Sequence, residues 1–138
     1  MGLIVDTGVF IVLERSGGTA GLGASEGPIF VSSITLSELW VGAHRADNET
    51  RRRRRLEFIE NFALPCDQLP FTTDTARVHS RLHADLLARG QMIGAHDLLI
   101  AATAVEHGLA VLTTNRREFD RIPGLAVVAY PLDPAPGA

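Results

Sequence analysis

Residues 3–13 read LIVDTGVFIVL, and this stretch decides the fold class. The run 3–5 is short, apolar and rich in β-branched side chains, as is typical of a buried strand, and it stops at Asp6. The apolar residues from 8 to 13 are too continuous for an exposed strand, so they predict a helix. A strand that passes directly into a helix begins an alternating α/β pattern.

The same alternation continues along the rest of the chain. A glycine-rich stretch at 16–28 is predicted to be a mobile surface loop. Further strands are predicted at 29–31, 68–71, 109–113 and 125–130, with helices at 34–46, from 49 to the stop at Pro65, and at 73–88, 97–107 and 116–119. This order predicts a mainly parallel central sheet of four to five strands with helices on both faces.

Length and composition fit one domain with a single core. The chain has 138 residues, of which 46% are hydrophobic. We expect the domain to span residues 1–131, followed by a frayed, proline-rich tail at 132–138. The net charge of −3 argues against a protein that coats nucleic acid or an anionic membrane through its overall charge. All 13 basic residues are Arg, which excludes P-loop and Schiff-base chemistry because both need a Lys.

Cys66 is the only cysteine. A disulfide framework and a zinc cluster of several thiolates are therefore excluded, and the composition fits a reducing cytoplasm. The longest apolar run, residues 98–105, is far shorter than the roughly 18 residues of a membrane span. We expect a cytoplasmic protein without a membrane anchor.

Three carboxylates and one amide are predicted to meet at one edge of the sheet. In an open parallel sheet, ligands bind beyond the carboxyl ends of the strands. Asp6 follows the first strand, and Asn115 follows the strand that ends at residue 113. Glu38 lies on a largely apolar helix, and Asp97 heads a helix whose next eight residues are almost all apolar. A carboxylate in apolar surroundings is costly without a partner, so these residues are candidates for a functional site.

Each carboxylate also has a purely structural interpretation. Asp6 could cap the helix that follows it, Glu38 could hold its carboxylate in water, and Asp97 could interact with the helix dipole, worth ~0.3–1 kcal/mol. These roles do not explain why all three carboxylates fall at the same edge. Crowded carboxylates repel one another unless a cation lies between them, and oxygen ligands favour Mg²⁺ or Mn²⁺. Such an ion can polarise a phosphodiester and activate water, which predicts phosphoryl transfer.

Four stretches, taken in order, carry a family resemblance. They are residues 3–7 (LIVDT), 33–39 (SITLSEL) with Gly42, 97–102 (DLLIAA), and 113–115 (TTN) with Phe119. Together they resemble the PIN-domain family, and within it the VapC-type toxins of bacterial toxin–antitoxin pairs. No single stretch is specific, but the ordered set spans nearly the whole chain.

The resemblance implies a Mg²⁺-dependent endoribonuclease, with Mn²⁺ as the alternative ion. It also implies a homodimer that is held inactive by a cognate VapB-like antitoxin. Carried over position by position, three carboxylates would form the metal site: Asp6, Glu38 and Asp97. Asn115 would lie near the fourth catalytic position, where many family members have an Asp, and the nearest acids in this chain are Glu118 and Asp120. From its position beside Asp97, His96 is expected to be a loop or capping residue, with a role in orienting the site as the alternative.

Other polar residues near the same edge are candidates for supporting roles. Thr7 and Thr113 are predicted to support the metal ligands through their hydroxyl groups, or else to cap chain ends. Arg116 and Arg117 could hold a phosphate that the acidic residues would otherwise repel, with an exposed turn as an equal alternative. Glu118, which follows Arg117, is also expected to support the metal ligands or to lie near the substrate.

The consecutive arginines Arg51–Arg55 radiate in every direction on a helix. We expect a solvated surface there, with contact to RNA or to an acidic antitoxin segment as the alternative. Part of the charge should be spent on pairs with acids of the same helix, namely Glu49, Glu57 and Glu60. Trp40, set among apolar neighbours, is expected in the core or in an interface.

Two rival functions remain open from the sequence. A non-catalytic PIN-like interaction module would use the acidic edge and the arginine-rich helix only to dock a partner. A metal-dependent phosphatase is disfavoured because Asp6 has no second Asp two residues later and the chain has no Lys. Because water would attack in line, the nuclease should leave 5′-phosphate and 3′-hydroxyl ends.

Overall fold

A five-stranded parallel sheet forms the centre of the computed structural model, which describes residues 2–17, 22 and 27–131. The strand order is β3-β2-β1-β4-β5. The strands are β1 (Leu3–Val5), β2 (Ile29–Ser32), β3 (Asp67–Leu69), β4 (Ala110–Thr113) and β5 (Val127–Ala129). The chain runs outward from β1 to β3 and then returns to β4 on the other side of β1. The strand order therefore reverses between β1 and β4, where parallel sheets bind their ligands.

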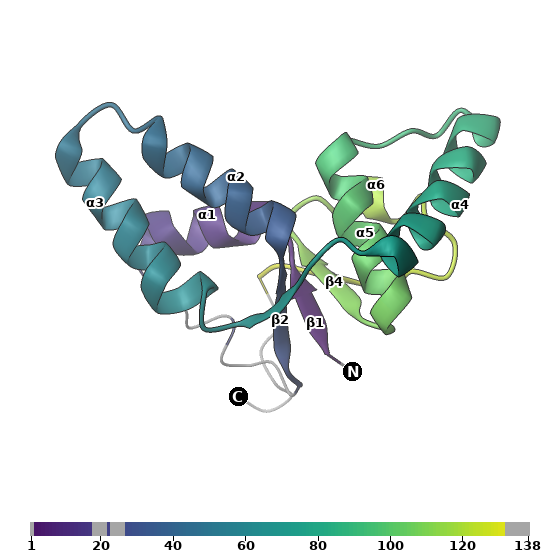
Figure 1. Cartoon of the computed structure of the whole chain (residues 1–138), viewed down its shortest axis with the longest axis horizontal. Helices are drawn as coiled ribbons and strands as arrows, with labels where there is room; N and C mark the ends of the chain where they lie inside the picture. Colours follow the sequence, from purple (N-terminus) through teal and green to yellow (C-terminus); the bar gives the residue numbers. More distant parts are fainter. Residues whose placement is uncertain (1, 18–21, 23–26, 132–138) are drawn as a thin grey trace.

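Helices cover both faces of the sheet (Figure 1). One face carries α1 (Thr7–Ser16), α2 (Ser33–His44), α3 (Glu49–Phe58) and a π-helical turn, η1 (Ile59–Ala63). The other face carries α4 (Thr73–Arg89), α5 (Ala95–His107) and α6 (Arg116–Phe119). No helix in the described part of the chain is both long and apolar enough to cross a bilayer.

The alternation of side chains along β1 divides the interior into two cores. Val5 is fully buried and packs with Phe10 of α1 on one face. Ile4 is also fully buried and packs with Ile100 of α5 on the other face. Because helices cover both faces, the central strands β1 and β4 are buried along their whole length, and this produces the short apolar runs in the sequence.

The predicted α/β class, the parallel sheet and the helices on both faces are confirmed. Three details differ. The helix expected to run from residue 49 to Pro65 ends at Phe58 and continues as the π-helical turn η1. Helix α5 begins at Ala95, so Asp97 lies in its first turn rather than at its start. Trp40 is 37% exposed on α2, which excludes the core and leaves the interface as the remaining prediction for this residue.

Two predicted segments fall on parts of the chain that the structure does not describe. The tail at 132–138 lies outside the described residues, as does most of the predicted loop at 16–28. Of that loop, residue 16 ends α1, and Gly17 follows with a φ of 74°, a left-handed conformation that glycine adopts without strain.

Candidate active site

Asp6 lies directly after the central strand β1, at the carboxyl edge of the sheet. Its side chain is nearly buried, and its Oδ2 atom accepts a hydrogen bond of 2.8 Å from the hydroxyl of Thr113, which ends β4. Although Asp6 occupies the N-cap position of α1, its side chain makes no capping hydrogen bond. The capping interpretation of Asp6 is therefore wrong, and its carboxylate is held across the strand-order reversal by β4.

Glu38 reaches the same edge from the middle of α2. Its Oε1 atom accepts a hydrogen bond of 2.8 Å from the hydroxyl of Thr7, and its Oε2 atom lies 3.1 Å from Nδ1 of His96. The hydroxyl of Thr7 also lies 3.1 Å from that of the buried Thr35. The side chain of Glu38 is partly exposed, as its structural interpretation expected, but both of its carboxylate oxygens have partners in the protein. His96, expected as a loop or capping residue, lies in the first turn of α5 and contacts the candidate site.

Asp97 lies one residue further along α5 and is partly buried. Burial raises the pKa of its carboxyl from 3.8 to about 7, helped by a hydrogen bond with Glu118 and by the negative charges of Asp6, Glu118 and Glu38. A hydrogen bond between two carboxyl groups requires a proton on one of them. Asp97 therefore holds its proton to a higher pH than an ordinary aspartate when no cation is bound.

The pKa of Asp6 is raised as well. Burial is the largest cause, and the charges of Glu38 and Glu118 add to it, while hydrogen bonds from Thr113 and the backbone of Thr7 oppose it. Four carboxylates, one between β1 and α1 and one each from α2, α5 and α6, thus lie close enough to influence one another. We call this set the acidic cluster; its members are Asp6, Glu38, Asp97 and Glu118.

The acidic cluster suits a hard divalent cation by its chemistry. Its donors are all oxygen atoms, and a cation would offset the repulsion that raises the pKa values of Asp6 and Asp97. Among the described residues, however, no three His, Cys, Asp or Glu side chains form a ready-made ligand group. The carboxylate oxygens of Asp6 and Glu38 are engaged with the hydroxyls of Thr113 and Thr7 and with His96. Binding of an ion would exchange these hydrogen bonds for coordination.

The comparison with known families agrees with this geometry. The model of the PIN domain matches residues 3–125, which include all four residues of the acidic cluster. The chain belongs to the PIN-domain family. The sequence resemblance is thereby confirmed.

Relatives of this PIN domain are ribonucleases by name. "Ribonuclease VapC1" of Rickettsia felis is 41% identical over 93% of this chain and 96% of its own length. "Ribonuclease VapC" of Rickettsia bellii is 39% identical over 96% of this chain and 98% of its own length. Among solved structures, DNA-bound VapBC from Salmonella typhimurium has a TM-score of 0.84 at 30% identity, covering 94% of this chain and 98% of that one. FitAcB from Neisseria gonorrhoeae has a TM-score of 0.76 at 27% identity, covering 91% and 95%.

The fourth acidic residue of this PIN domain is Glu118. It lies in the short helix α6, is partly buried and reaches both Asp97 and Asp6. Asp120 instead accepts a hydrogen bond of 3.2 Å from Arg116 on the surface. The side chain of Asn115 is exposed and makes no hydrogen bond with the described residues, although its backbone N–H donates to Thr113 at 2.9 Å. The sequence named Glu118 and Asp120 as the nearest acids to the fourth position without choosing between them, and the structure makes Glu118 the one that belongs to the acidic cluster.

The hydroxyl of Thr113 connects β4 to the acidic cluster. It is fully buried, donates to Asp6 and accepts from the backbone of Asn115. Of the two arginines after Asn115, Arg116 is paired with Asp120, while Arg117 is exposed and has no partner among the described residues. Arg117 is therefore the one of the two whose guanidinium is available to a ligand.

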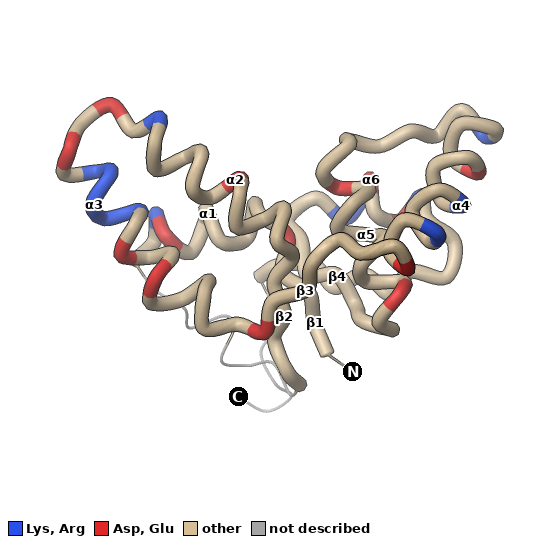
Figure 2. The backbone as a smooth tube through the Cα atoms, in the orientation of Figure 1, with Lys and Arg blue, Asp and Glu red and all other residues tan. Residues whose placement is uncertain are grey.

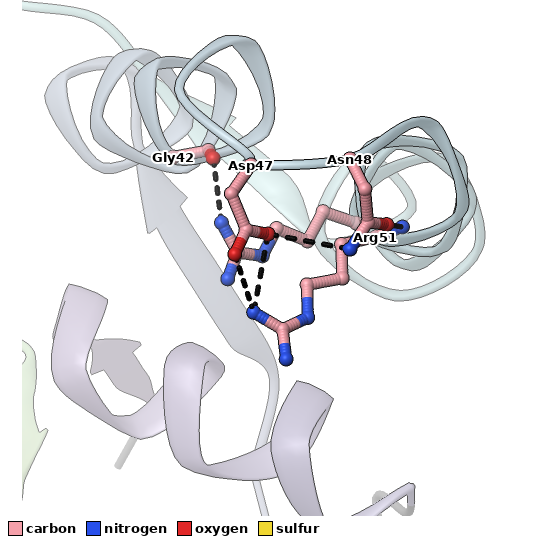
Figure 3. A network of polar contacts seen from close by, with 5 residues as sticks. Gly42, Asp47, Asn48 and Arg51 are labelled. Carbon is pink, nitrogen blue, oxygen red and sulfur yellow. Dashed lines mark hydrogen bonds and ion pairs between the residues drawn. The ribbon is translucent and has the colours of Figure 1, made fainter.

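Acidic residues lie along the backbone near the arginine run of α3 (Figure 2), and three of its five arginines form ion pairs. Arg51 pairs with Asp47, Arg52 with Glu49, and Arg54 with Glu14 of α1. Arg55 donates a hydrogen bond of 2.8 Å to the backbone carbonyl of Gly42 and so ties α3 to α2. Figure 3 shows Gly42 next to the contacts that Arg51 makes with Asp47 and Asn48. The predicted pairing with Glu49 is confirmed, but the structure shows no ion pair of these arginines with Glu57 or Glu60, both of which it describes.

Proposed function

We propose that this chain is the toxin of a toxin–antitoxin pair and a metal-dependent endoribonuclease. The observation that carries the proposal is the acidic cluster, formed at the strand-order reversal of a PIN domain that is 41% identical to a VapC ribonuclease. PIN-domain ribonucleases depend on a divalent metal ion, and we propose Mg²⁺, with Mn²⁺ as the alternative. A carboxylate with a pKa of about 7 is ready to exchange its proton for a cation at neutral pH.

In this proposal Asp6, Glu38 and Asp97 hold the ion, and Glu118 completes the acidic cluster. When bound, a divalent ion polarises the phosphodiester and makes water acidic enough to attack it. Thr7 and Thr113 fix the orientation of the carboxylates of Glu38 and Asp6 through the hydrogen bonds described above.

The remaining site residues act on the RNA substrate. Asn115, exposed beside the acidic cluster, orients the substrate through its free amide group. Arg117 binds a phosphate, because its guanidinium has no partner among the described residues, and Arg116 joins it when its exposed pair with Asp120 opens. The cationic groups let an RNA backbone approach a site that is otherwise strongly negative.

The partners follow from the named relatives. Solved neighbours such as VapBC from Salmonella typhimurium are complexes of a toxin with its antitoxin, which supports a VapB-like antitoxin for this chain. We further propose that the protein acts as a homodimer in the cytoplasm, where its RNA substrate and a reducing environment for Cys66 are found.

The direct test is incubation of the purified protein with total RNA in the presence of Mg²⁺ or of a chelator. We expect cleavage only with the metal ion, and new ends that carry 5′-phosphate and 3′-hydroxyl groups when they are sequenced. Ends with 2′,3′-cyclic phosphate, or cleavage that survives the chelator, would contradict the metal-dependent reaction. A protein that binds its antitoxin but cuts no RNA under any condition would instead be an interaction module.

The identity of the fourth acid gives a second test. We expect Glu118→Gln to weaken Mg²⁺ binding by about 10- to 100-fold, because the lost charge belongs to the acidic cluster. Asp120→Asn removes an equal charge two residues away, but that carboxylate is paired with Arg116, so its affinity should stay within about twofold of the wild type. Titration calorimetry measures both, and equal losses in the two variants would remove Glu118 from the site.

A further inference from the structure

A small cavity adjoins the acidic cluster on the side of α1 and α3. Its volume is about 140 Å³, and residues of α1, α2, α3 and η1 line it. Leu39, Phe58 and Ile59 give it a buried apolar floor, and Ile11 of α1 is an exposed apolar residue at its rim. Glu38 belongs both to this cavity and to the acidic cluster. A ligand in the cavity therefore lies next to the proposed point of cleavage.

The cavity contains both hydrogen-bond donors and acceptors. The donors are the guanidinium groups of Arg15 in α1 and Arg55 in α3, and the acceptor is the carboxylate of Glu14 in α1. Arg15 of α1 is exposed and has no partner among the described residues. Arg55 is partly buried and fixed by its hydrogen bond to the carbonyl of Gly42, which leaves its other N–H groups available. Glu14 is nearly buried, with a side chain that is 9% exposed. Its Oε1 atom accepts from Arg54 at 3.1 Å, and its Oε2 atom has no hydrogen-bond partner among the described residues.

This lining fits a flat, uncharged, polar ring better than it fits an ion. The two arginines and two glutamates balance, so the cavity has no excess charge that would hold a phosphate by itself. An apolar cavity of about 150 Å³ takes up a benzene ring, so the present volume of about 140 Å³ is enough for one six-membered ring of a base. Unpaired nucleobases are recognised in this way, by apolar or guanidinium stacking together with hydrogen bonds to their edges.

The donor and acceptor set matches guanine most fully, because guanine offers two acceptors and two N–H donors at its edges, whereas cytosine and uracil each offer two acceptors and one such donor group. Guanine presents acceptors at O6 and N7, which a guanidinium binds in a bidentate manner, and N–H donors at N1 and N2, which a carboxylate accepts. Adenine presents an amino donor in place of O6 and would set it against an arginine. We propose that this cavity binds an unpaired guanine of the RNA next to the scissile phosphate, with Arg15 and Arg55 as donors and Glu14 as acceptor. This inference rests on the proposed ribonuclease function.

Cleavage of a randomised single-stranded RNA pool tests the proposal. We expect wild-type cuts to be enriched for guanine at one fixed position close to the cut. This enrichment should fall by at least about fivefold in two variants, Gly42→Phe and Arg15→Gln. Gly42 lines the cavity and has open space around the position of an added side chain, so a phenylalanine there would fill the cavity. Arg81→Gln on α4 is the matched control, because Arg81 is also exposed without a partner among the described residues and should keep the enrichment. Equal enrichment in all four proteins would overturn the proposal.

A second measurement is independent of cleavage and separates this proposal from the proposed function. Saturation-transfer NMR should detect binding of guanosine 5′-monophosphate to the wild type, weaker binding of adenosine 5′-monophosphate, and loss of the guanosine contact in Gly42→Phe. Equal binding of both nucleotides, or no binding, overturns the guanine site even if the protein cuts RNA. If the cut pattern of Gly42→Phe is unchanged but the co-expressed antitoxin no longer co-purifies, the cavity contacts the protein partner instead.

Discussion

Replacement of Asp97 by Asn is expected to lower RNA cleavage by at least about 10²-fold at saturating Mg²⁺. The amide keeps the size and one oxygen of the carboxylate but removes a negative charge that acts on both Asp6 and Glu118. An ion held by fewer charges is bound more weakly and is placed less accurately against the phosphate. The measurement is kcat/KM on a single-stranded RNA at several Mg²⁺ concentrations.

Asp67→Asn supplies the matched control for this loss. Asp67 is exposed on β3, makes no hydrogen bond or ion pair with described side chains, and lies on the edge strand, away from the strand-order reversal. The same change of charge at this position should leave kcat/KM within about twofold of the wild type. If Asp97→Asn kept more than a tenth of the wild-type rate while Mg²⁺ was still required, Asp97 would not be a ligand of the catalytic ion.

Asp6 shows which part of the site a sequence can predict. A short apolar run followed by an acid is a local pattern, and the rule that ligands gather at the carboxyl ends of parallel strands converts it into a position in space. The same rule works for Glu38 and Asp97 because each lies on a helix whose buried face is visible as apolar periodicity. The hydrogen bond from Thr113 to Asp6 follows from the adjacency of β1 and β4, which strand alternation alone does not determine.

Glu118 shows where this reasoning ends. Glu118 lies in α6 and Asp120 follows it as the C-cap; two helical positions correspond to a rotation of about 200°, so the orientation of this four-residue helix decides which acid faces the site. No apolar periodicity can be read in so short a helix. The contact between His96 and Glu38 is hidden for a similar reason, because it depends on how α5 packs against α2 rather than on either sequence alone.

The arginine-rich helix illustrates a different limit. Its pairing with Glu49 is a neighbour contact along one helix and could be predicted. The bonds of Arg54 to Glu14 and of Arg55 to Gly42 join separate helices, and they decide which guanidinium groups line the cavity beside the acidic cluster. The π-helical turn η1 is likewise a product of packing, since Ile59 and Ala63 in it are fully buried and the apolar sequence fits an ordinary helix equally well.

The same Asp97→Asn variant is expected to be more stable than the wild type when no metal ion is present. The pKa of Asp97 is about 7 in the folded protein against 3.8 for an ordinary aspartate. Between these values the unfolded chain has lost the proton and the folded protein still holds it, so wild-type stability falls as the pH rises from about 4 to about 7. Above pH 7 this loss is complete and stability no longer changes through this group. The amide that replaces the carboxyl in the variant has no proton to lose in this range, so the variant should not show this fall.

The size of the effect decides against a purely structural role for Asp97. The pKa shift corresponds to at most about 4 kcal/mol, and because the carboxyl is partly exposed we expect roughly 1–2 kcal/mol, or about 3–6 °C in Tm at pH 8. A favourable interaction with the dipole of α5 would oppose it by only ~0.3–1 kcal/mol.

Thermal melts in chelator should therefore show equal Tm values at pH 4.5 and a higher Tm for the variant at pH 8, with Asp67→Asn unchanged at both. Addition of Mg²⁺ should reverse the order at pH 8, because only the wild type binds the ion tightly. A variant that melts lower than the wild type at pH 8 in chelator would show that Asp97 serves to stabilise its helix and that repulsion within the acidic cluster is minor.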